Sequence, residues 1–273
     1  PNWTIPNAIA LGNTMVLKPS EQVPLSANRI AELLHDAGLP DGVFNIVHGG
    51  QVAVQAICDH AGIKAITFVG STKVAKIVYQ RGTSNLKRVL ALGGAKNHLI
   101  VLPDAHPEMA ASNIAASMSG CAGQRCMAGS LLMSVGNGDN LREEVVGAMD
   151  GLALGNTYDN PDAQMGPVID GAARDRLFAR IASAESDGLT LARDGRAGVP
   201  EDGFFVGPTL VDQVEPGRDI FRDELFGPVL SMLHPRTLDE AIEWLNLLPY
   251  GNAATIFTQD GNAARKFARE VQC

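Results

Sequence analysis

The stretch FVGSTKVAKIV, residues 68–78, passes from a short apolar run through a glycine into a helical pattern. Val74, Ile77 and Val78 recur at the i, i+3, i+4 spacing that lines one face of a helix. A strand that leads at once into a helix is the building unit of α/β proteins. The stretch therefore predicts an α/β fold.

The turn within this stretch leaves two interpretations open. Gly70 allows the backbone to approach a ligand closely, and Ser71 can cap the helix and meet a phosphate at its positive end. The pattern is not GxGxxG, however, because Ala75 stands at the third glycine position. On these residues alone, an ordinary capped turn is favoured over a cofactor site.

On either side of this stretch, short apolar runs alternate with further helical patterns. The apolar runs cover residues 14–18, 43–47, 65–70 and 88–92. Strands that are apolar throughout and joined by helices predict a parallel sheet covered on both faces. Such a sheet is typical of a dinucleotide-binding domain, although many α/β folds share it.

The remainder of the chain continues the same alternation less regularly and predicts a second α/β domain. We place the boundary so that residues 1–93 form the first domain and residues 94–273 the second. Helices are predicted at 107–118, 140–150, 171–186, 238–248 and 261–271. Strands are predicted at 99–102, 131–135, 189–193, 209–214, 229–233 and 254–258.

Composition narrows the class of protein. The 273 residues carry a net charge of −8, without the basic excess of a general nucleic-acid binder. No apolar run approaches the length of a membrane span, and the first residues lack the layout of a signal peptide. Four cysteines in a chain of this length make no disulfide framework and favour a reducing compartment. The two ends of the sequence suggest a fragment that lacks both ends of a longer chain.

The segment LKPSEQ, residues 17–22, follows the first predicted strand. Ligands of open parallel sheets bind beyond the carboxyl ends of the strands, where Lys18 and Glu21 would lie. These two side chains could bind ribose hydroxyls. On the residues alone, a solvated helix start with Ser20 as its cap is favoured.

The segment CAGQRCMAGS, residues 121–130, contains two cysteines. A metal site is disfavoured because neither has a histidine nearby. The small residues around Cys126 would let a substrate come close, and the positive charge of Arg125 favours thiolate over thiol. A reactive thiol and a packed turn of small residues are equally compatible with this composition.

Six segments in order resemble successive motifs of the aldehyde dehydrogenase superfamily across nearly the whole chain. They are GNTMVLKPSEQVPLSA, GLPDGVFNIVHG, FVGSTKVA, GQRCMAGS, GPTLVDQV and DELFGPVL. The resemblance implies a Rossmann-type parallel-sheet NAD domain followed by an α/β catalytic domain that is incomplete at its C-terminus. Residues 1–93 would be the C-terminal part of the NAD domain. In such enzymes the cysteine that matches Cys126 attacks the aldehyde, hydride passes to the nicotinamide, and a thioester remains.

The resemblance also assigns cofactor-binding residues. Lys18 and Glu21 match the ligands of the adenine ribose, and Ser71 matches the residue near the pyrophosphate. Glu224 of DELFGPV matches the ligand of the nicotinamide ribose, and Phe226 matches the ring that packs nearby. Gln22 and Gly93 are assigned to the same cofactor site. NAD is favoured over NADP because Glu21 would repel a 2′-phosphate. The family's oxyanion-hole asparagine belongs to a motif upstream of residue 1.

One position departs from the hydrolytic members of this superfamily. Where they carry ELGGK, with glutamate as general base, this chain has RVLALGGAKNH with Leu92 or Ala91 at the glutamate position. No acidic residue occurs from 82 to 103. A general base contributes about 10²–10⁴ to rate, so water would attack the thioester poorly. A thiol is partly ionised at neutral pH without a base, which predicts coenzyme A as the acyl acceptor.

The segments GAKNH and GQRCMA together resemble the CoA-acylating, methylmalonate-semialdehyde dehydrogenase branch. This resemblance implies oxidation of methylmalonate or malonate semialdehyde, loss of CO₂, and transfer of propionyl or acetyl to CoA. Arg125 would hold the substrate carboxylate by charge-assisted hydrogen bonds, unless it only pairs within a loop. We expect Cys121 to be a small core residue. His98 belongs to the branch pattern but has no physical role that the sequence reveals.

The resemblance further implies a homotetrameric parent protein in the bacterial cytosol or the mitochondrial matrix. Valine, thymine and inositol breakdown are all compatible pathways, and both semialdehydes are compatible substrates. Two alternatives stay open: a hydrolytic aldehyde dehydrogenase that uses another base, and an inactive fragment that binds only nucleotide or partners.

Overall fold

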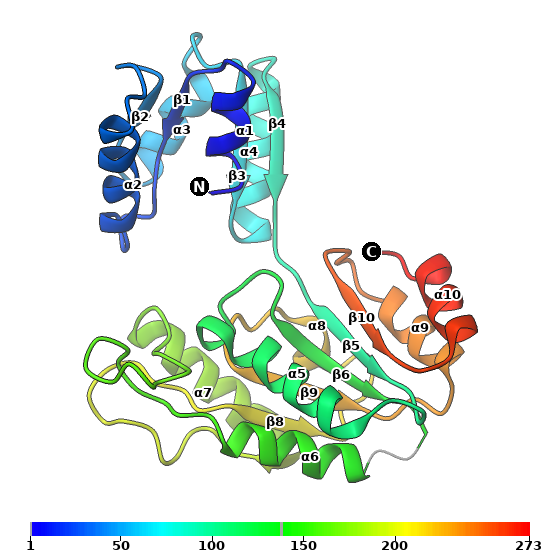
Figure 1. The fold of residues 1–273 in the computed structure, drawn as a ribbon. Helices are drawn as coiled ribbons and strands as arrows, with labels where there is room; N and C mark the ends of the chain where they lie inside the picture. Colours follow the sequence, from blue (N-terminus) through cyan, green and yellow to red (C-terminus); the bar gives the residue numbers. More distant parts are fainter. Residues whose placement is uncertain (1, 137–138) are drawn as a thin grey trace. The chain divides into compact units, whose positions relative to one another are not determined.

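The structure, a computed structural model, describes residues 2–136 and 139–273 (Figure 1). The chain divides into two compact units, residues 1–94 (unit 1) and residues 95–273 (unit 2). The sequence placed its domain boundary one residue earlier. None of the helices in the described part of the chain combines the length and apolarity needed to span a bilayer.

Unit 1 contains the strands and helices that the apolar runs predicted, together with a short first helix. In chain order they are α1 (Ile5–Ala10), β1 (Met15–Leu17), α2 (Leu25–Asp36), β2 (Phe44–Ile46), α3 (Gln51–Asp59), β3 (Ala65–Val69), α4 (Thr72–Ser84) and β4 (Arg88–Leu92). The strands pair in parallel, β1 with β2 and β3 with β4.

The expectation of one parallel sheet covered on both faces is wrong for unit 1 as described, since its strands form two separate two-stranded sheets and the β3–β4 pair is covered on one face only. Along β3 and β4, exposed residues alternate with more buried ones; Val69 and Leu90 are each 56% exposed. The reason is that α3 and α4 pack on the same face, where Cys58, Ile66 and Val78 form a small core.

Unit 2 is built on a six-stranded sheet with the order β10-β5-β6-β9-β8-β7. All neighbours are parallel except β7, which runs antiparallel to β8 at one edge. The strands are β5 (Asn97–Val101), β6 (Gly129–Ser134), β7 (Thr190–Arg193), β8 (Thr209–Asp212), β9 (Val229–Leu233) and β10 (Ala254–Phe257). The helices are α5 (Pro107–Ser119), α6 (Asp139–Asp150), α7 (Gly171–Ser186), α8 (Asp219–Arg222), α9 (Leu238–Asn246) and α10 (Gly261–Glu270), with the 3₁₀ turn η1 (Gly120–Gly123).

Helices cover both faces of this sheet (Figure 1). Side chains along each parallel strand alternate between two cores, as Leu132 and Met133 of β6 do. The core on one face includes side chains of α5 and α6, and the core on the other includes side chains of α7, α9 and α10. Unit 2 therefore has the doubly covered sheet that the sequence predicted for α/β domains.

Candidate active site

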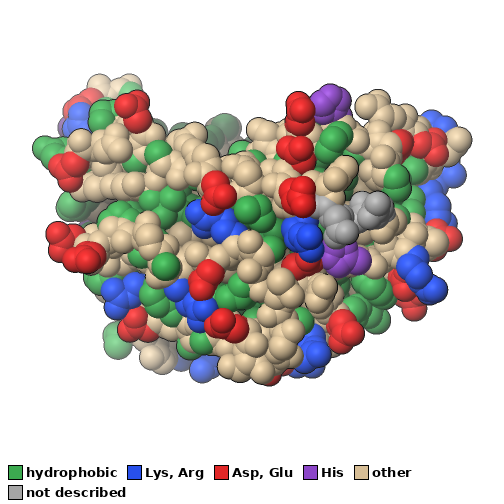
Figure 2. All heavy atoms as spheres, turned by 90° about the horizontal axis from the view of Figure 1, so that it is seen from below, with side chains coloured by type: hydrophobic (Ala, Val, Ile, Leu, Met, Phe, Trp, Pro, Cys, Tyr) green, Lys and Arg blue, Asp and Glu red, His purple; other side chains and the backbone are tan. Residues whose placement is uncertain are grey.

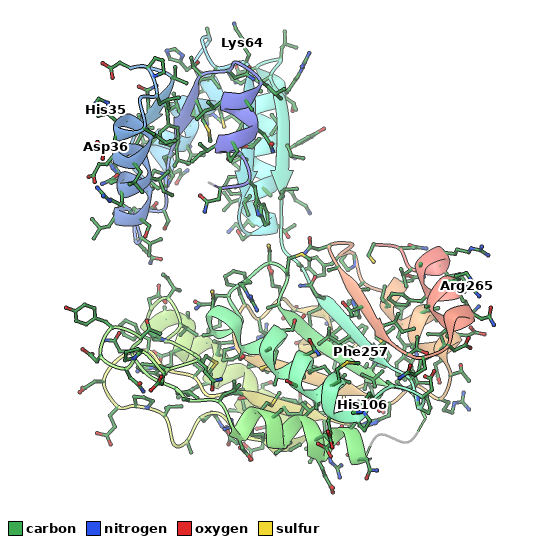
Figure 3. All side chains as sticks on the ribbon, viewed as in Figure 1. His35, Asp36, Lys64, His106, Phe257 and Arg265 are labelled. Atoms are coloured by element: carbon green, nitrogen blue, oxygen red, sulfur yellow. The ribbon has the colours of Figure 1, made fainter. Side chains whose placement is uncertain are left out.

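The predicted site residues of unit 2, together with Asn252, gather at the amino ends of neighbouring parallel strands. Cys126 precedes β6, Glu224 and Phe226 precede β9, and Asn252 precedes β10. These strands and β5 lie side by side in the sheet. His106, after β5, and Phe257, the last residue of β10, are labelled in Figure 3 and belong to the opposite, carboxyl ends. The usual rule for ligands of open sheets, which points to carboxyl ends, does not locate this cluster.

The loop that carries Cys126 begins with a tight left-handed turn. Cys121, Ala122 and Gly123 have φ angles of 51°, 52° and 70°. Ala122 fills the core and is fully buried, whereas Cys121 is exposed. The expectation that Cys121 is a core residue is therefore wrong, because the turn places its neighbour there instead. A side chain at Gly123 would collide with the backbone carbonyl of Gly227, so this loop packs against the segment before β9.

Two side-chain amides hold the backbone of Cys126, one from the buried Asn97 and one from the exposed Asn252. Asn97 Nδ2 donates to the carbonyl of Cys126 at 2.7 Å and to that of Ala128 at 2.8 Å. Asn252 Nδ2 donates to the same Cys126 carbonyl at 2.8 Å. The strand register shifts between Asn97 and His98, an irregularity of the kind that often re-aims a side chain beside an active site. Neither asparagine was identified from the sequence.

Cys126 is partly exposed, and its N–H donates no hydrogen bond to any described residue. Gln124 fixes the preceding turn, because its Nε2 donates to the carbonyl of Cys121 at 3.0 Å, and its Oε1 ties the loop to residue 169 by accepting the N–H of Ile169 at 2.8 Å. The loop thus combines a held backbone with an unoccupied N–H next to the thiol, which is the donor needed at an oxyanion.

Arg125 has a structural contact in addition to its predicted role. Its Nη2 donates to the carbonyls of Ala116 and Ser117, both at 3.3 Å, near the C-terminus of α5. A cation is favoured there by the helix dipole. The guanidinium also covers Gly120, where a Cβ would collide with it. Its Nη1 and Nε atoms make no hydrogen bond to the described residues, so Arg125 still has N–H donors that could bind a carboxylate.

Glu224 and Phe226 lie on a short loop before β9. Glu224 is half-buried, and its Oε1 accepts the N–H of Ala95 at 3.0 Å. Phe226 is 44% exposed and has a φ of 53°, an uncommon conformation for a bulky residue. Strain of this kind clusters at functional sites, and the cofactor-contacting role that the resemblance assigned to Phe226 stays a prediction.

The predicted cofactor residues of unit 1 lie beyond carboxyl ends of its strands. Lys18 Nζ donates to Glu21 Oε2 at 2.8 Å, and this bond lowers the pKa of the Glu21 carboxyl. Ser20 does not cap a helix: its Oγ accepts the N–H of Gln22 at 3.3 Å, and α2 begins only at Leu25. The alternative interpretation of this segment as a capped helix start is therefore wrong.

The two glycine turns after β3 and β4 are joined to each other. Thr72 Oγ1 accepts the N–H of Gly94 at 2.9 Å, and Gly93 lies against the Thr72 backbone. Ser71 occupies the N-cap position of α4, yet its side chain accepts no hydrogen bond from that helix. Its hydroxyl and the first N–H groups of a 13-residue helix are thus placed as a phosphate site requires.

Within the described residues, no three or more His, Cys, Asp or Glu side chains group so as to hold a metal ion. The face drawn in Figure 2 carries acidic and basic side chains interspersed, so no patch of one sign dominates it.

The sequence profile described as the aldehyde dehydrogenase family matches residues 1–273, and the chain belongs to this family. A malonate-semialdehyde dehydrogenase of Geobacillus kaustophilus is 48% identical over 274 residues, which cover 99% of this chain and 56% of the relative. The crystal structure of methylmalonate-semialdehyde dehydrogenase from Oceanimonas doudoroffii is 44% identical with a TM-score of 0.96, covering 99% of this chain and 56% of that one.

A third relative is a cysteine-to-alanine mutant of the indole-3-acetaldehyde dehydrogenase of P. syringae, whose structure was solved in complex with NAD⁺. It is 35% identical with a TM-score of 0.94, and the match covers 98% of this chain and 55% of that one. The chain thus spans little more than half the length of these relatives. The family and the fold class predicted from the sequence are confirmed, whereas the roles of individual residues stay predictions.

Proposed function

We propose that the whole protein is an NAD-dependent, CoA-acylating dehydrogenase of malonate or methylmalonate semialdehyde. The observation that carries the proposal is the apolar end of β4, where Ala91 and Leu92 stand in place of a general base. Relatives named for both semialdehydes, at 44% and 48% identity, support this substrate class and leave the choice between the two substrates open.

The residues of unit 1 fit a dinucleotide. The helix start at Ser71 suits a pyrophosphate, and the Lys18–Glu21 pair offers a donor and an acceptor for ribose hydroxyls. Gln22 and Gly93 belong to the same two turns. NAD, when bound, supplies the hydride acceptor. A relative solved with NAD⁺ supports this choice of cofactor.

Cys126 carries the covalent chemistry in this proposal. Its thiolate attacks the aldehyde carbon, and the oxygen becomes an alkoxide that the Cys126 N–H can stabilise. Loss of one such donor typically costs about 10²–10³ in rate. When the C–H bond breaks with its electron pair, the carbonyl re-forms as a thioester on Cys126. Arg125, with donors left beyond its α5 contacts, would orient the substrate carboxylate. When that carboxylate leaves as CO₂, the electron pair of the C–C bond passes to the thioester carbonyl as an enolate, which takes up a proton from water to give the acetyl or propionyl thioester.

Deacylation then depends on the nucleophile. No carboxylate lies in residues 82–103 to deprotonate water. The thiolate of coenzyme A attacks the thioester carbon without such help, and the Cys126 sulfur leaves as thiolate. The parent protein would be a homotetramer acting in valine, thymine or inositol breakdown. Bacterial relatives favour the bacterial cytosol as its compartment over the mitochondrial matrix.

Product analysis with and without coenzyme A tests the proposal on the full-length protein. We expect sustained NADH formation and acyl-CoA product only when coenzyme A is present. Without it, NADH formation should stop after about one equivalent per site, because the thioester accumulates. Undiminished turnover to the free acid would show a hydrolytic enzyme instead. NAD binding without iodoacetamide labelling of Cys126 would show a nucleotide-binding relative without this chemistry.

A further inference from the structure

Lys96 is a buried lysine in unit 2 that the proposed chemistry does not use. Its residue is 2% exposed, and its Nζ donates to the carbonyls of Ile220 at 2.9 Å and Asp223 at 2.7 Å. It forms no ion pair within the described part of the chain. The ammonium therefore donates its hydrogen bonds to backbone carbonyls of a single loop.

That loop carries Glu224 and is held from several directions. Besides the two bonds from Lys96, the N–H of Ala95 donates to the Glu224 carboxylate at 3.0 Å. Arg180 Nη2 pairs with Asp223 at 2.5 Å, and Arg176 Nη1 donates to the carbonyl of Leu225 at 2.7 Å. Of these partners only Lys96 is fully buried, and it adjoins Ala95 in the chain. Residues 95–96 thus fix both the backbone of the loop and the carboxylate itself.

Burying an ammonium is costly, and this cost shows that stability alone does not explain Lys96. Burial lowers the pKa of Lys96 to about 7, although the charges of Asp223 and Glu224 oppose that shift. Arg180 lowers the pKa further, and Lys96 in turn lowers the pKa of nearby His98. Apolar replacements of buried ion pairs are often neutral or stabilising, which motivates the hypothesis that this buried charge is retained for the geometry that it imposes.

We propose that Lys96 is a positioning residue for cofactor binding, which fixes the loop 220–225 so that the Glu224 carboxylate is presented to the nicotinamide ribose. The inference rests on the proposed role of Glu224. Hydrogen bonds from a charged donor are the stronger ones, so loss of the Lys96 bonds would let the loop and the carboxylate shift together.

The chain supplies a matched control in Lys87. This lysine is also buried, at 8% exposure, and its Nζ donates to two backbone carbonyls, those of His60 and Ile63, both at 2.6 Å. It lies in unit 1 at the amino end of β4, away from the turns after β3 and β4. Lys96→Met and Lys87→Met therefore remove the same kind of interaction from two places.

Equilibrium binding of NAD to the full-length protein tests the inference. Lys96→Met should raise the dissociation constant for NAD about 10- to 100-fold, the effect of losing charged hydrogen bonds, while Lys87→Met changes it less than about twofold. The rate of iodoacetamide labelling of Cys126 without NAD should stay unchanged in both. Equal effects of the two variants, or no effect of Lys96→Met, would overturn the inference.

Glu224→Gln separates this inference from the function on which it rests. If Glu224→Gln leaves NAD affinity unchanged, the ribose-binding role of Glu224 itself is wrong. If it weakens binding, Lys96→Met should add little in the Glu224→Gln background, because both changes act through one carboxylate. Fully additive effects would contradict the positioning role. Should Lys96→Met fail to fold, Lys96→Gln, which is shorter and uncharged, takes its place; it should raise the dissociation constant for NAD about 10-fold or more, and an unchanged value would contradict the inference.

Discussion

The carbonyl of Cys126 accepts hydrogen bonds from two side-chain amides, so in the proposed chemistry a backbone atom helps to position the nucleophile. Asn97 and Asn252 reach it from positions 29 and 126 residues away in the sequence. Because the carbonyl belongs to the residue proposed as nucleophile, a small rotation of that peptide would move the thiol. Misplacement by about 1 Å can cost about 10²-fold in rate, so we regard both asparagines as positioning residues.

Asn252→Ala should lower kcat/KM about 10- to 100-fold, since Asn97 alone would then hold the Cys126 carbonyl. The measurement is steady-state kinetics on the full-length protein, together with the unfolding midpoint. Asn246→Ala is the control: its amide also bridges distant backbone, from Glu270 to Gln272, but far along the chain from the thiol. It should cost about 1 kcal/mol of stability and leave kcat/KM within about twofold. Equal kinetic losses in both variants would contradict the positioning role.

Some residues of the candidate site can be identified from a sequence motif, whereas others come together only when the chain folds. Cys126 and Glu224 stand in segments whose local pattern resembles a family. Asn252 carries no local signal, because its partner lies 126 residues away. Lys96 and Asn97 stand in the segment GAKNH, but nothing in that segment reveals their contacts with residues far along the chain. For Asn252 the one hint was a polar residue just before a predicted strand, which is a common feature of α/β loops.

At the scale of elements, strands occur in unit 2 where the sequence predicted them; β5, β8 and β9 are buried at every position, whereas β7 and β10 are only partly buried. The helix α8 and the turn η1 were missed since four residues are too short to show a period. The exposed faces of β3 and β4 were missed for a different reason. An apolar run indicates that a strand can be buried on both faces. It does not indicate on which face of the sheet the connecting helices pack.

The turn η1 suggests a test of how the thiol loop is built. Gly123→Ala should destabilise the protein by about 3 kcal/mol, from a left-handed φ of 70° and a collision with the Gly227 carbonyl. Gly147→Ala in α6 provides the contrast, because a Cβ there meets nothing within 4 Å. In an exposed helix interior this change should stabilise by about 0.5–1 kcal/mol. Urea unfolding followed by circular dichroism checks both, and a neutral Gly123→Ala would refute the proposed packing.

At the scale of the whole molecule, buried titratable groups in unit 2 link stability to pH. His98 is 2% exposed, and among the described residues its Nε2 is a buried nitrogen without a hydrogen-bond partner. Burial, aided by the charge of Lys96, lowers its pKa from 6.5 to about 4. Between pH 4 and 6.5, His98 is therefore protonated in the unfolded state but remains neutral in the folded state. Stability is present above pH 6.5 and is lost as the pH falls toward 4.

Other buried groups in unit 2 act in different windows, so the contribution of His98 can be isolated. Burial would raise the pKa of Asp212, but hydrogen bonds from His234, Gln213 and Arg142 outweigh it and hold that pKa below its usual 3.8. Its contribution is thus lost only below about pH 4. Burial lowers the pKa of Lys96 from 10.5 to about 7, so the free energy of unfolding increases as the pH is raised from 7 to 10.5. Among these three groups, His98 is the one whose protonation changes the stability between pH 4 and 6.5.

His98→Leu should therefore flatten the pH dependence of unfolding between pH 6.5 and 4, where the wild type loses up to about 3 kcal/mol. The two tryptophans allow unit 2 to be observed separately: Trp3 lies in unit 1 and Trp244 on α9, so a Trp3→Phe background reports on unit 2. His60→Leu, at an exposed histidine of unit 1, controls for the loss of a histidine as such. If His98→Leu keeps the wild-type slope in this interval, the imidazole is protonated in the folded state, and a group other than His98 must account for the loss of stability in acid.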